Sequence, residues 1–305
     1  MNCLLLNKNS GISSFDSLKP VKKALKTPKV CHTGTLDSFA RGLLVILTGR
    51  AVKLSSVFTG CDKQYRALLR FGEETDTLDP LGTIVATGPI PRREELEAAL
   101  PSFTGTILQA PPSYSAIHIN GRRAHELARA GIQVDMKKRP VTIYRISLAA
   151  WNPPHAELEI YCSSGTYIRS LARDLALSIG SRAHLFSLQR TMVGDFLLED
   201  ALSLPDGTAG ESLTGIDFSF SIEEKIKAAL LPLNPELFTK LGISSVYIDE
   251  KTARSVSRGG DLKPLQKTLS ELNKNTIALF GPQSFAALIE QKDSLWKYSF
   301  VNATD

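Results

Sequence analysis

One aspartate stands in the most informative segment of the chain. Asp37 lies in the run Lys-Val-Cys-His-Thr-Gly-Thr-Leu-Asp-Ser-Phe-Ala-Arg-Gly at 29–42, which precedes five apolar residues at 43–47. The apolar residues predict a buried strand, so the carboxylate is expected at the rim of a rigid sheet. A carboxylate held in such a place can act as a nucleophile or a ligand. The alternative is an aspartate that only caps a turn, which is the commoner role of Asp in such a loop.

The other reactive side chains do not indicate metal or nucleotide chemistry. The five histidines form no His-Glu-x-x-His pattern, and the chain has no Walker or dinucleotide glycine loop. The cysteines lie too far apart for a zinc knuckle or a disulfide framework: Cys3, Cys31, Cys61 and Cys162. We therefore expect no metal, no cofactor and free thiols. No signal peptide or membrane-spanning run is evident, which predicts a cytoplasmic protein.

The charge of the chain suits a polyanionic partner. The formal net charge is +5 and the pI is about 8.9. Lysines recur at 19, 22, 23, 26 and 29, and a second basic run contains Arg122, Arg123, Arg129, Lys137, Lys138 and Arg139. Such runs are typical of nucleic-acid binding, although solvated helix faces carry similar charge.

Hydrophobic periodicity and turn residues predict an α+β fold on a mixed, mostly antiparallel sheet. The expected elements are helices from Ser13 to Leu25, at 51–58, 91–100 and 120–130 and from Gly165 to Ile179, and strands at 43–47, 64–71, 83–86, 141–151, 156–163 and 184–191. A small polar stretch at 206–215 predicts a surface loop. We place one domain at 1–240 and a second, β-rich domain at 241–305.

Several ordered segments resemble the bacterial tRNA pseudouridine synthases that act on uridine-55, the TruB family. The segment His-Thr-Gly-Thr-Leu-Asp at 32–37 carries the resemblance most strongly. Four others follow the family's order: Gly-Ile-Ser-Ser at 11–14, Lys-Gln-Tyr-Arg at 63–66, Pro-Ser-Tyr-Ser-Ala at 112–116, and Gly-Thr-Tyr-Ile-Arg at 165–169. The stretch at 120–131 resembles the segment with which that family grips RNA, and the tail from 246 to 280 resembles in outline a PUA module.

The resemblance implies the pseudouridine synthase fold and a cofactor-free isomerisation. Uridine becomes pseudouridine when the N-glycosidic bond breaks, the uracil rotates, and its C5 joins the same C1′ carbon. The resemblance assigns Asp37 as nucleophile, Arg169 as its orienting partner, and Tyr65 to base stacking and proton transfer. Tyr167 and Leu188 are assigned to the pocket wall. From the residues alone, both tyrosines and the leucine fit an ordinary core equally well.

The resemblance also implies how RNA would bind. A stacked uridine must be extruded before it can react, and His32 is assigned to fill the gap that it leaves. Arg122 and Arg123, in an RNA-gripping insertion at about 118–139, are expected to hold phosphates. The expected partner is the T arm of tRNA, bound by a monomer.

Four residues depart from the family pattern: Asn9, Cys31, Ser38 and Arg41. Glycine is usual at position 31, and if it serves a positive φ there, Cys31 has to take another path. Two alternatives remain open from the sequence: a non-catalytic RNA-binding protein, and a guide-RNA-dependent synthase. The tail at 241–305 has the further alternative of a short extension packed on the catalytic sheet.

Overall fold

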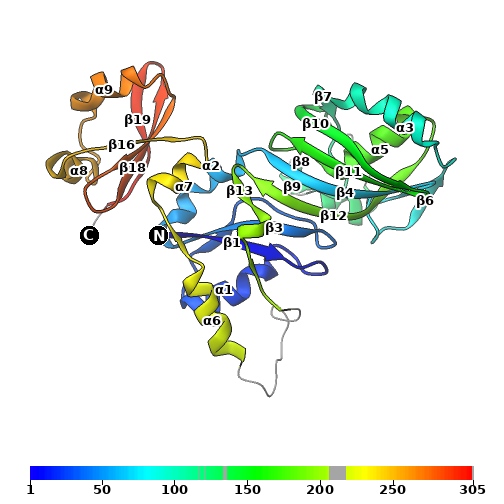
Figure 1. Ribbon diagram of the computed structural model, residues 1–305, viewed down its shortest axis with the longest axis horizontal. Coiled ribbons are helices and arrows are strands. Elements are labelled where there is room, and N and C mark those ends of the chain that lie inside the picture. The colour runs from blue at the N-terminus through cyan, green and yellow to red at the C-terminus, as the bar shows by residue number, and fades with distance from the viewer. Residues whose placement is uncertain (116, 120, 133–135, 206–217, 304–305) are drawn as a thin grey trace.

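The computed structural model describes residues 1–115, 117–119, 121–132, 136–205 and 218–303 (Figure 1). Its centre is an eleven-stranded sheet with the order β14-β1-β3-β12-β4-β11-β10-β7, to which β2, β13 and β15 add at the sides. The strands are β1 (Asn2–Lys8), β2 (Val30–His32), β3 (Arg41–Thr48), β4 (Lys63–Phe71), β7 (Gly105–Gln109), β10 (Arg139–Asn152), β11 (His155–Cys162), β12 (Ala183–Val193), β13 (Phe196–Leu197), β14 (Leu202–Ser203) and β15 (Leu231–Pro232).

The sheet is mixed, and most of its pairs are antiparallel. Among the pairs of the described residues, β1 with β14 and β3 with β12 run parallel, and the other pairs in this sheet are antiparallel. The predicted α+β class and mixed, mostly antiparallel sheet are therefore confirmed. The predicted strands at 43–47 and 64–71 are found as β3 and β4, with Tyr65, Ala67 and Leu69 buried on one face of β4.

Helices cover one face of the larger half of the sheet. The α-helices are α1 (Lys19–Leu25), α2 (Ser55–Thr59), α3 (Arg93–Ala99), α4 (Ala124–Arg129), α5 (Ile168–Ser178), α6 (Phe218–Ala228), α7 (Pro235–Thr239), α8 (Glu250–Val256) and α9 (Gln266–Glu271). Leu171 and Leu175 recur at helical spacing and place α5 against β4, β11 and β12 in one buried cluster. That packing fixes the start of α5, where Tyr167 and Arg169 lie.

The sheet's other half is covered by α1 and α6. Leu4 and Leu6 of β1 and Ile46 of β3 pack against Val21 and Ile226 in a second cluster. Ser13 caps the turn that leads into α1, since its hydroxyl accepts from the Asp16 backbone N–H at 3.0 Å. Phe15, inside the helix predicted from Ser13 to Leu25, instead precedes the helical segment and is 63 % exposed, and the Lys22 amino group lies 4.8 Å from its ring centroid.

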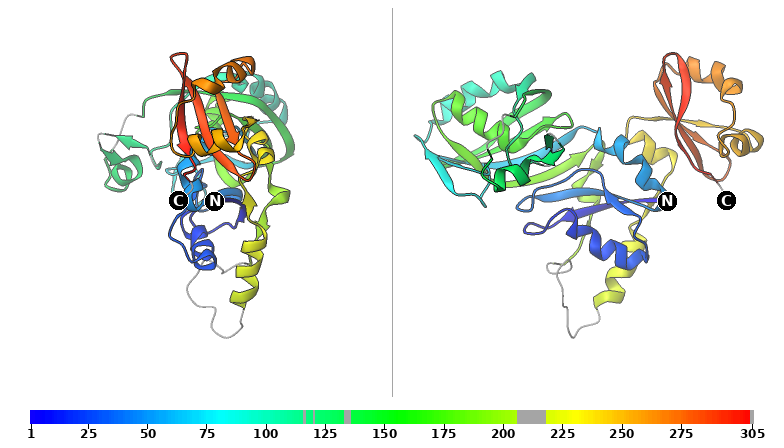
Figure 2. Two further views of the ribbon diagram at one scale, coloured as in Figure 1. Left: turned by 90° about the vertical axis from the view of Figure 1, so that its left-hand side faces the viewer. Right: turned by 180° about the vertical axis from the view of Figure 1, so that it is seen from behind.

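The C-terminal residues form a separate four-stranded sheet with the order β16-β17-β18-β19. Its strands are β16 (Ser244–Tyr247), β17 (Thr276–Phe280), β18 (Phe285–Lys292) and β19 (Leu295–Val301), with α8 and α9 beside them (Figure 2). The sheet has its own buried cluster, which includes Val256, Leu269 and Ile289.

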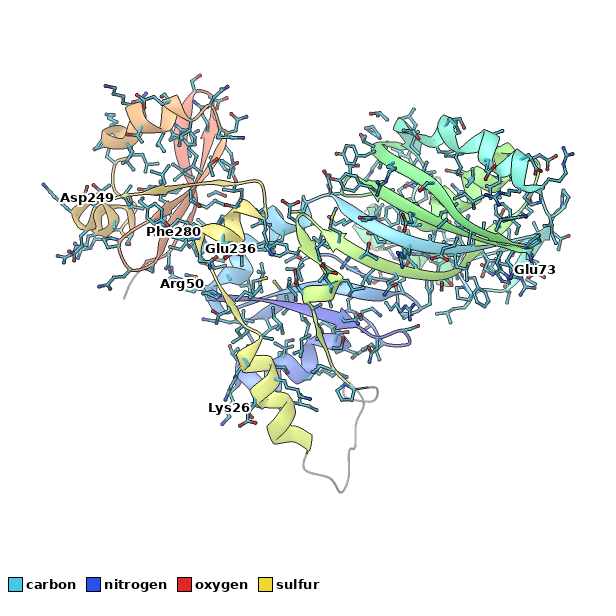
Figure 3. The ribbon with its side chains drawn as sticks, viewed as in Figure 1. Lys26, Arg50, Glu73, Glu236, Asp249 and Phe280 are labelled. Atoms are coloured by element: carbon cyan, nitrogen blue, oxygen red, sulfur yellow. The ribbon has the colours of Figure 1, made fainter. Side chains whose placement is uncertain are left out.

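The two sheets meet in a shared apolar cluster. The Phe238 ring of α7 lies 5.7 Å from the Phe280 ring and 4.8 Å from the Phe285 ring, centroid to centroid. Arg50 donates to the carbonyls of Ala303 at 2.6 Å and Val301 at 3.2 Å. Figure 3 labels Arg50 and Phe280 at this junction.

A short insertion stands out from the large sheet. It contains the hairpin of β8 (His118–Ile119) and β9 (Arg122–Arg123) followed by α4, and the left view of Figure 2 shows it projecting to one side. The helix predicted at 120–130 is therefore shorter, because a hairpin occupies its first residues. A second hairpin pairs β5 (Glu73–Thr75) with β6 (Ile84–Thr87), the strand predicted at 83–86.

The surface loop predicted at 206–215 lies outside the described residues. None of the helices that the structure does describe has the length and apolar character needed to cross a bilayer.

Candidate active site

Asp37 lies in the loop between β2 and β3, and neighbouring segments fix this loop on both sides. The Ser14 hydroxyl accepts from the Leu36 N–H at 2.8 Å and donates to the Leu36 carbonyl at 2.9 Å. The Gly11 N–H donates to the Ser38 carbonyl at 2.8 Å. The backbone on either side of Asp37 is therefore held by hydrogen bonds from the segment at 11–14.

A buried lysine ties the same loop together. The Lys8 side chain is 1 % exposed, and its ammonium donates to the carbonyls of Ile12 and Ala40, both at 2.7 Å, and of Asn9 at 2.9 Å. Burial lowers the pKa of Lys8 to about 8, although the nearby Asp37 carboxylate opposes that fall. Lys8 thus holds the two ends of the loop by charge-assisted hydrogen bonds.

Gly42 lets β3 approach β12 closely behind this loop. Its φ is +109°, and a Cβ built on it would lie 2.3 Å from the Arg190 carbonyl oxygen. No side chain fits there. The glycine therefore brings Arg190 and Tyr65, which are partners across β12 and β4, up to the loop of Asp37.

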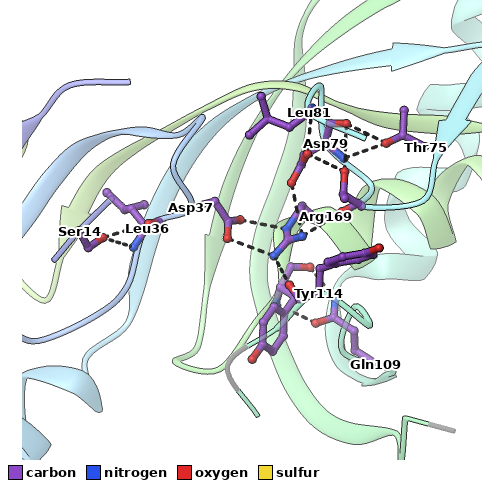
Figure 4. A network of polar contacts seen from close by, with 11 residues as sticks. Ser14, Leu36, Asp37, Thr75, Asp79, Leu81, Gln109, Tyr114 and Arg169 are labelled. Atoms are coloured by element: carbon purple, nitrogen blue, oxygen red, sulfur yellow. Dashed lines mark hydrogen bonds and ion pairs between the residues drawn. The ribbon is translucent and has the colours of Figure 1, made fainter. Parts of the chain in front are cut away.

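Arg169 binds the Asp37 carboxylate in a bidentate pair (Figure 4). Its Nε lies 2.9 Å from Oδ2 of Asp37, and its Nη2 donates to Oδ1 at 3.1 Å. The arginine is 5 % exposed, whereas the aspartate side chain is 36 % exposed. The carboxylate is thus fixed from the protein side and open from the other, as a group that meets a ligand must be.

The remaining donors of Arg169 are also occupied. Nη2 donates to the Tyr114 carbonyl at 2.9 Å, and Nη1 donates to the Thr77 carbonyl at 2.9 Å and to Oδ2 of Asp79 at 3.5 Å. Asp79 is held in turn by the Thr77 hydroxyl at 2.6 Å and the Leu81 N–H at 3.0 Å. All five N–H groups of the guanidinium therefore have acceptors, so Arg169 is locked in one orientation.

The environment of Asp37 shifts its protonation. Burial raises the pKa of the Asp37 carboxyl, and the Asp79 charge raises it further, while Arg169 and Lys8 act in the opposite direction. The net direction is upward. A carboxylate with a raised pKa binds a proton or an electrophilic carbon more readily than an ordinary surface aspartate.

Both predicted tyrosines lie beside this pair. Tyr65 on β4 is buried and lies opposite Arg190 in the pairing of β4 with β12, and the charges of Arg190 and Asp37 act on its phenol. Tyr167 is the N-cap residue of α5, and Gln109 fixes its backbone by accepting from its N–H at 2.8 Å and donating to its carbonyl at 3.1 Å. Burial raises the pKa of both phenols.

Leu188 and His32 lie close to the same site. Leu188 on β12 belongs to the buried cluster that contains Tyr65 and Leu36. His32 ends β2, half-buried, and burial together with the Arg190 charge lowers the pKa of its imidazole. Its Nδ1 has no hydrogen-bond partner among the described residues. The histidine is therefore a neutral ring at neutral pH, which suits stacking better than ion pairing.

Of the two predicted RNA-binding arginines, the structure describes the side chain of Arg122, for which no contact with Asp37 is found. Arg122 is exposed on β9 in the projecting hairpin. Arg123 follows it on the same strand, and its side chain lies outside what the structure describes. The site residues at 32, 37, 65, 167, 169 and 188 therefore form one group, and the projecting insertion of β8, β9 and α4 is separate from it.

The arrangement offers a fixed carboxylate, a phenol and a neutral imidazole. Among the described residues, no group of three or more His, Cys, Asp or Glu side chains could hold a metal ion. All four cysteines are free thiols, and burial raises the pKa of Cys3 and of Cys162 to about 12. The side chains at Asp37 can supply nucleophilic attack and proton transfer.

Comparison with known proteins decides the family. Residues 22–168 match the model of the TruB family pseudouridylate synthase N-terminal domain. A "tRNA pseudouridine synthase B" of Borreliella burgdorferi (strain ZS7) is 47 % identical over 224 residues, which cover 72 % of this chain and 79 % of that protein. The chain belongs to the TruB family of pseudouridylate synthases. A protein of the same name from Bordetella avium (strain 197N) is 45 % identical over 75 % of this chain and 94 % of its own length.

Solved structures share the TruB-family fold with this chain. The chain superposes on a protein in "Crystal Structure of a Cbf5-Nop10-Gar1 Complex" with a TM-score of 0.69, at 20 % identity, over 99 % of this chain and 85 % of the other. A protein in "Structure of H/ACA RNP bound to a substrate RNA containing 2'-deoxyuridine" gives a TM-score of 0.67 at 20 % identity, over 99 % and 84 %. The pseudouridine synthase fold predicted from the sequence is confirmed.

The departures from the TruB-family pattern are accommodated locally. Cys31 lies in the extended strand β2, paired with Leu47, and is not among the residues with positive φ. No glycine is needed there. Asn9 donates from its side chain to the Leu204 carbonyl at 3.3 Å, Ser38 supplies a backbone acceptor, and Arg41 is exposed at the start of β3.

Sequence reasoning missed four residues that shape the TruB-family site: Lys8, Asp79, Gln109 and Arg190. Asp79 lies between the strands predicted at 64–71 and 83–86, in residues to which no role is assigned from the sequence. Its one sequence signal is the segment Thr-Asp-Thr-Leu-Asp at 75–79, which ends like the segment Thr-Leu-Asp at 35–37. Lys8 ends β1 after the apolar run at 3–6, and Arg190 lies in a strand that alternates apolar and polar residues, so no sequence pattern marks either side chain as buried.

Proposed function

We propose that the chain is a tRNA pseudouridine synthase that isomerises uridine-55 in the T loop. The observation that carries this proposal is the Asp37 carboxylate, held on both oxygens by Arg169 and still 36 % exposed. Family membership supplies the reaction, and the names of the relatives, "tRNA pseudouridine synthase B", supply the substrate class. The reaction is an intramolecular group transfer, so the enzyme is an isomerase.

The chemistry requires few groups, and the site contains them. Asp37 attacks the target nucleotide, the bond between N1 and C1′ breaks, and the detached uracil rotates. Its C5 then bonds to C1′ and the bond to Asp37 breaks, C5 loses its proton, and N1, which carries no proton in uridine, gains one, so the atoms of the nucleotide are conserved. Asp37 is proposed as the nucleophile, Arg169 as the group that orients it, and Tyr65 as the base-stacking and proton-transfer group.

Substrate binding is proposed to use a different part of the molecule. Tyr167 and Leu188 would form the wall beside the uracil, and His32 would stack in the gap left by the extruded base. Arg122 and Arg123 on the insertion at about 118–139 would hold phosphates of the T arm. The exposed Arg122 and the basic residues in the sequence of this insertion support this role.

We also propose that the two sheets belong to domains with separate roles. Residues 1–240 would form the catalytic domain, and residues 241–305 a PUA-like RNA-binding domain. A four-stranded sheet with its own buried cluster supports the second unit. We further propose that the protein acts as a monomer in the cytoplasm.

The test uses purified protein and an RNA labelled with tritium at uracil C5. A T-arm hairpin should release tritium and carry pseudouridine at position 55, and a hairpin with cytidine at that position should not. Binding without tritium release would favour the non-catalytic RNA-binding alternative. Release that requires an added guide RNA would favour the guide-dependent alternative, and both results would contradict the proposal.

A further inference from the structure

One exposed aromatic ring lies near the proposed site and has no part in the proposed mechanism. Phe15 immediately precedes the helical turn Asp16–Leu18 that leads into α1, and its side chain is 63 % exposed. The Lys22 ammonium lies over the ring, 4.8 Å from its centroid. Single exposed apolar residues are common in proteins. A ring that a cation covers in part and that is otherwise open to solvent, however, is a surface on which a flat aromatic group can stack.

Hydrogen bonds connect the backbone at Phe15 to the loop of Asp37. The preceding residue, Ser14, is buried, and its hydroxyl bonds to both the N–H and the carbonyl of Leu36. Figure 4 shows Ser14 and Leu36 on the side of Asp37 away from Arg169. The ring is therefore one residue from a contact that is itself one residue from Asp37. An RNA loop placed on the carboxylate lies within reach of it.

The residues after Phe15 form a basic surface. The segment at 16–29 contains five lysines and one acid. Leu18, Val21 and Ala24 face the buried cluster beneath α1, so the other side of the segment faces outward. That side carries the exposed lysines at 19, 23, 26 and 29 and the half-buried lysine at 22. Because Lys22 contacts the Phe15 ring, the ring and the lysines belong to one surface.

The nearby acids do not neutralise this surface. Asp16 pairs with Lys19 at 2.9 Å. The adjacent helix α6 has two glutamates and two lysines at 222–228, so these residues add no net charge. Within the part of the chain that the structure describes, Lys22 and Lys23 pair with no carboxylate. Their ammonium groups are thus available to an anionic partner.

A basic surface with an exposed ring fits a single-stranded nucleic acid. Proteins that bind single strands combine cations that hold the phosphates with aromatic side chains on which the bases stack. Unpaired loop bases are the ones that RNA-binding proteins splay out and stack on aromatic rings. An acidic peptide would engage the lysines alone. The ring and its position beside the loop of Asp37 therefore favour RNA.

We propose that Phe15 is a stacking platform for an unpaired base of the RNA loop bound at Asp37, and that Lys22 and the lysines beside it bind the neighbouring phosphates. This inference rests on the proposed function and adds a second RNA contact to it. Stacking supplies affinity that does not depend on salt, and the lysines supply affinity that does.

The two RNA contacts approach Asp37 from different sides. The projecting insertion begins shortly after Tyr114, whose carbonyl accepts from Arg169. The segment of α1 begins shortly after Ser14, on the side of Asp37 away from that arginine. A loop bound by both surfaces is held on each side of the reacting nucleotide, which limits its freedom to shift along the site.

The test measures affinity for a T-arm hairpin against salt concentration. Phe15→Ala should weaken binding by about 10-fold at every salt concentration, because a lost stacking contact changes no counterion release. Phe15→Trp keeps an aromatic platform and should bind within about 2-fold of the wild type. Lys22→Gln should weaken binding mostly at low salt and reduce the slope of log affinity against log salt by about 0.7–0.9.

A second exposed ring provides the matched control. Phe186 on β12 is 45 % exposed and packs against the His155 ring, 5.0 Å centroid to centroid. Phe186→Ala should bind the hairpin as the wild type does. Since the Phe15 ring is mostly exposed, Phe15→Ala should also keep the wild-type midpoint of unfolding in denaturant. Wild-type affinity in Phe15→Ala, or equal losses of affinity in the two alanine variants, would overturn the assignment.

Crosslinking identifies the base and does not depend on an alanine variant. With p-benzoylphenylalanine at position 15, light should join the protein to an unpaired nucleotide of the hairpin loop, and the same group at position 186 should give no such product. Crosslinks from position 15 that are absent or confined to the paired stem would contradict the stacking role.

These measurements separate the inference from the proposed function, because neither binding nor crosslinking requires turnover. An inactive wild type whose binding still depends on Phe15 would overturn only the proposed function. An active wild type that binds equally well without the ring would overturn only the role of Phe15.

Discussion

Arg169 holds Asp37 by both carboxylate oxygens, at 2.9 Å and 3.1 Å, and cannot turn away because its other donors are bound as well. The Asp37 carboxylate is therefore already oriented before RNA binds. Such preorganisation removes the cost of ordering the nucleophile during the reaction. The relationship also links the loop at 33–40, the hairpin at 73–87 and the start of α5 through one side chain.

The pH dependence of the reaction should show the effect of the Asp79 charge on the pKa of Asp37. Attack requires ionised Asp37, so the rate falls as pH drops through its pKa. Burial and the Asp79 charge raise that pKa. The acid limb of the pH–rate profile, where the rate falls toward low pH, should therefore have its midpoint above the ordinary aspartate pKa of about 3.9. Asp79→Asn removes the like charge and should move the limb to lower pH. Single-turnover rates across pH measure both positions.

A nearby carboxylate provides the control for that experiment. Glu74 lies on β5 of the same hairpin, 3.9 Å from the Arg182 guanidinium. Glu74→Gln should leave the acid limb where the wild type has it. A limb that moves equally in both variants, or that moves upward in Asp79→Asn, would show that Asp79 does not act on Asp37 as described.

Lys8 should make stability depend on pH between about 8 and 10.5. The folded protein releases the Lys8 proton at about 8, whereas the unfolded chain keeps it to the ordinary value of 10.5. The unfolded state binds more protons in that window, so the free energy of unfolding rises with pH there, relative to Lys8→Met, by about 3 kcal/mol. Denaturant unfolding of both proteins at several pH values measures the difference.

An exposed lysine serves as the reference for Lys8. Lys23 lies on the solvent side of α1, and Lys23→Met should differ from the wild type by the same amount at every pH in the window. A difference between wild type and Lys8→Met that stays flat, or falls with pH, would mean that the Lys8 ammonium is not buried in solution.

Gly42 and Gly105 form a matched pair for testing the close approach of β3 to β12. Both have positive φ, +109° and +91°, but a Cβ on Gly42 would lie 2.3 Å from the Arg190 carbonyl, and a Cβ on Gly105 meets nothing within 4 Å. Gly42→Ala should cost about 1–3 kcal/mol more than Gly105→Ala and should also slow the reaction. Equal losses of unfolding free energy would mean that the strands can move apart freely.

Much of the large sheet and the central ion pair could be predicted from sequence. The apolar run at 43–47 and the alternation at 64–71 are both typical of strands, and β3 and β4 are found where expected. The pairing of Asp37 with Arg169 came from the resemblance, since the two residues are 132 positions apart. No local sequence pattern predicts a contact between residues so far apart in the chain.

The parts that could not be predicted depend on contacts distant in sequence. Asp79 gains its role only because Leu185 of β12 donates a backbone hydrogen bond to Leu78, at 3.1 Å, and thereby brings the hairpin to Arg169. Arg190 is buried because Gly42 lets its strand approach. The helix predicted at 120–130 is shortened by the β8–β9 hairpin, since the Asn120-Gly121 turn signal competes with the helical pattern.

The proposed grip on RNA can be tested apart from the chemistry. Arg122→Ala with Arg123→Ala should weaken T-arm binding and reduce the slope of log affinity against log salt by up to about 0.7–0.9 for each lost phosphate contact. The single-turnover rate at saturating RNA should change little. Arg92→Ala with Arg93→Ala removes another adjacent pair, which α3 holds in ion pairs with Glu95 and Glu97, and should leave affinity unaltered. The same salt slope in wild type and the first variant would exclude the grip.

The most direct measurement compares the wild type with Asp37→Asn on one T-arm hairpin, following RNA affinity and pseudouridine at position 55 in the same samples. Asparagine keeps the shape of the side chain and one oxygen for Arg169, but it cannot attack the nucleotide. The variant should bind the hairpin within a few-fold of the wild type, about 1 kcal/mol or less, and form no pseudouridine. Pseudouridine formed at the wild-type rate by Asp37→Asn would contradict the account.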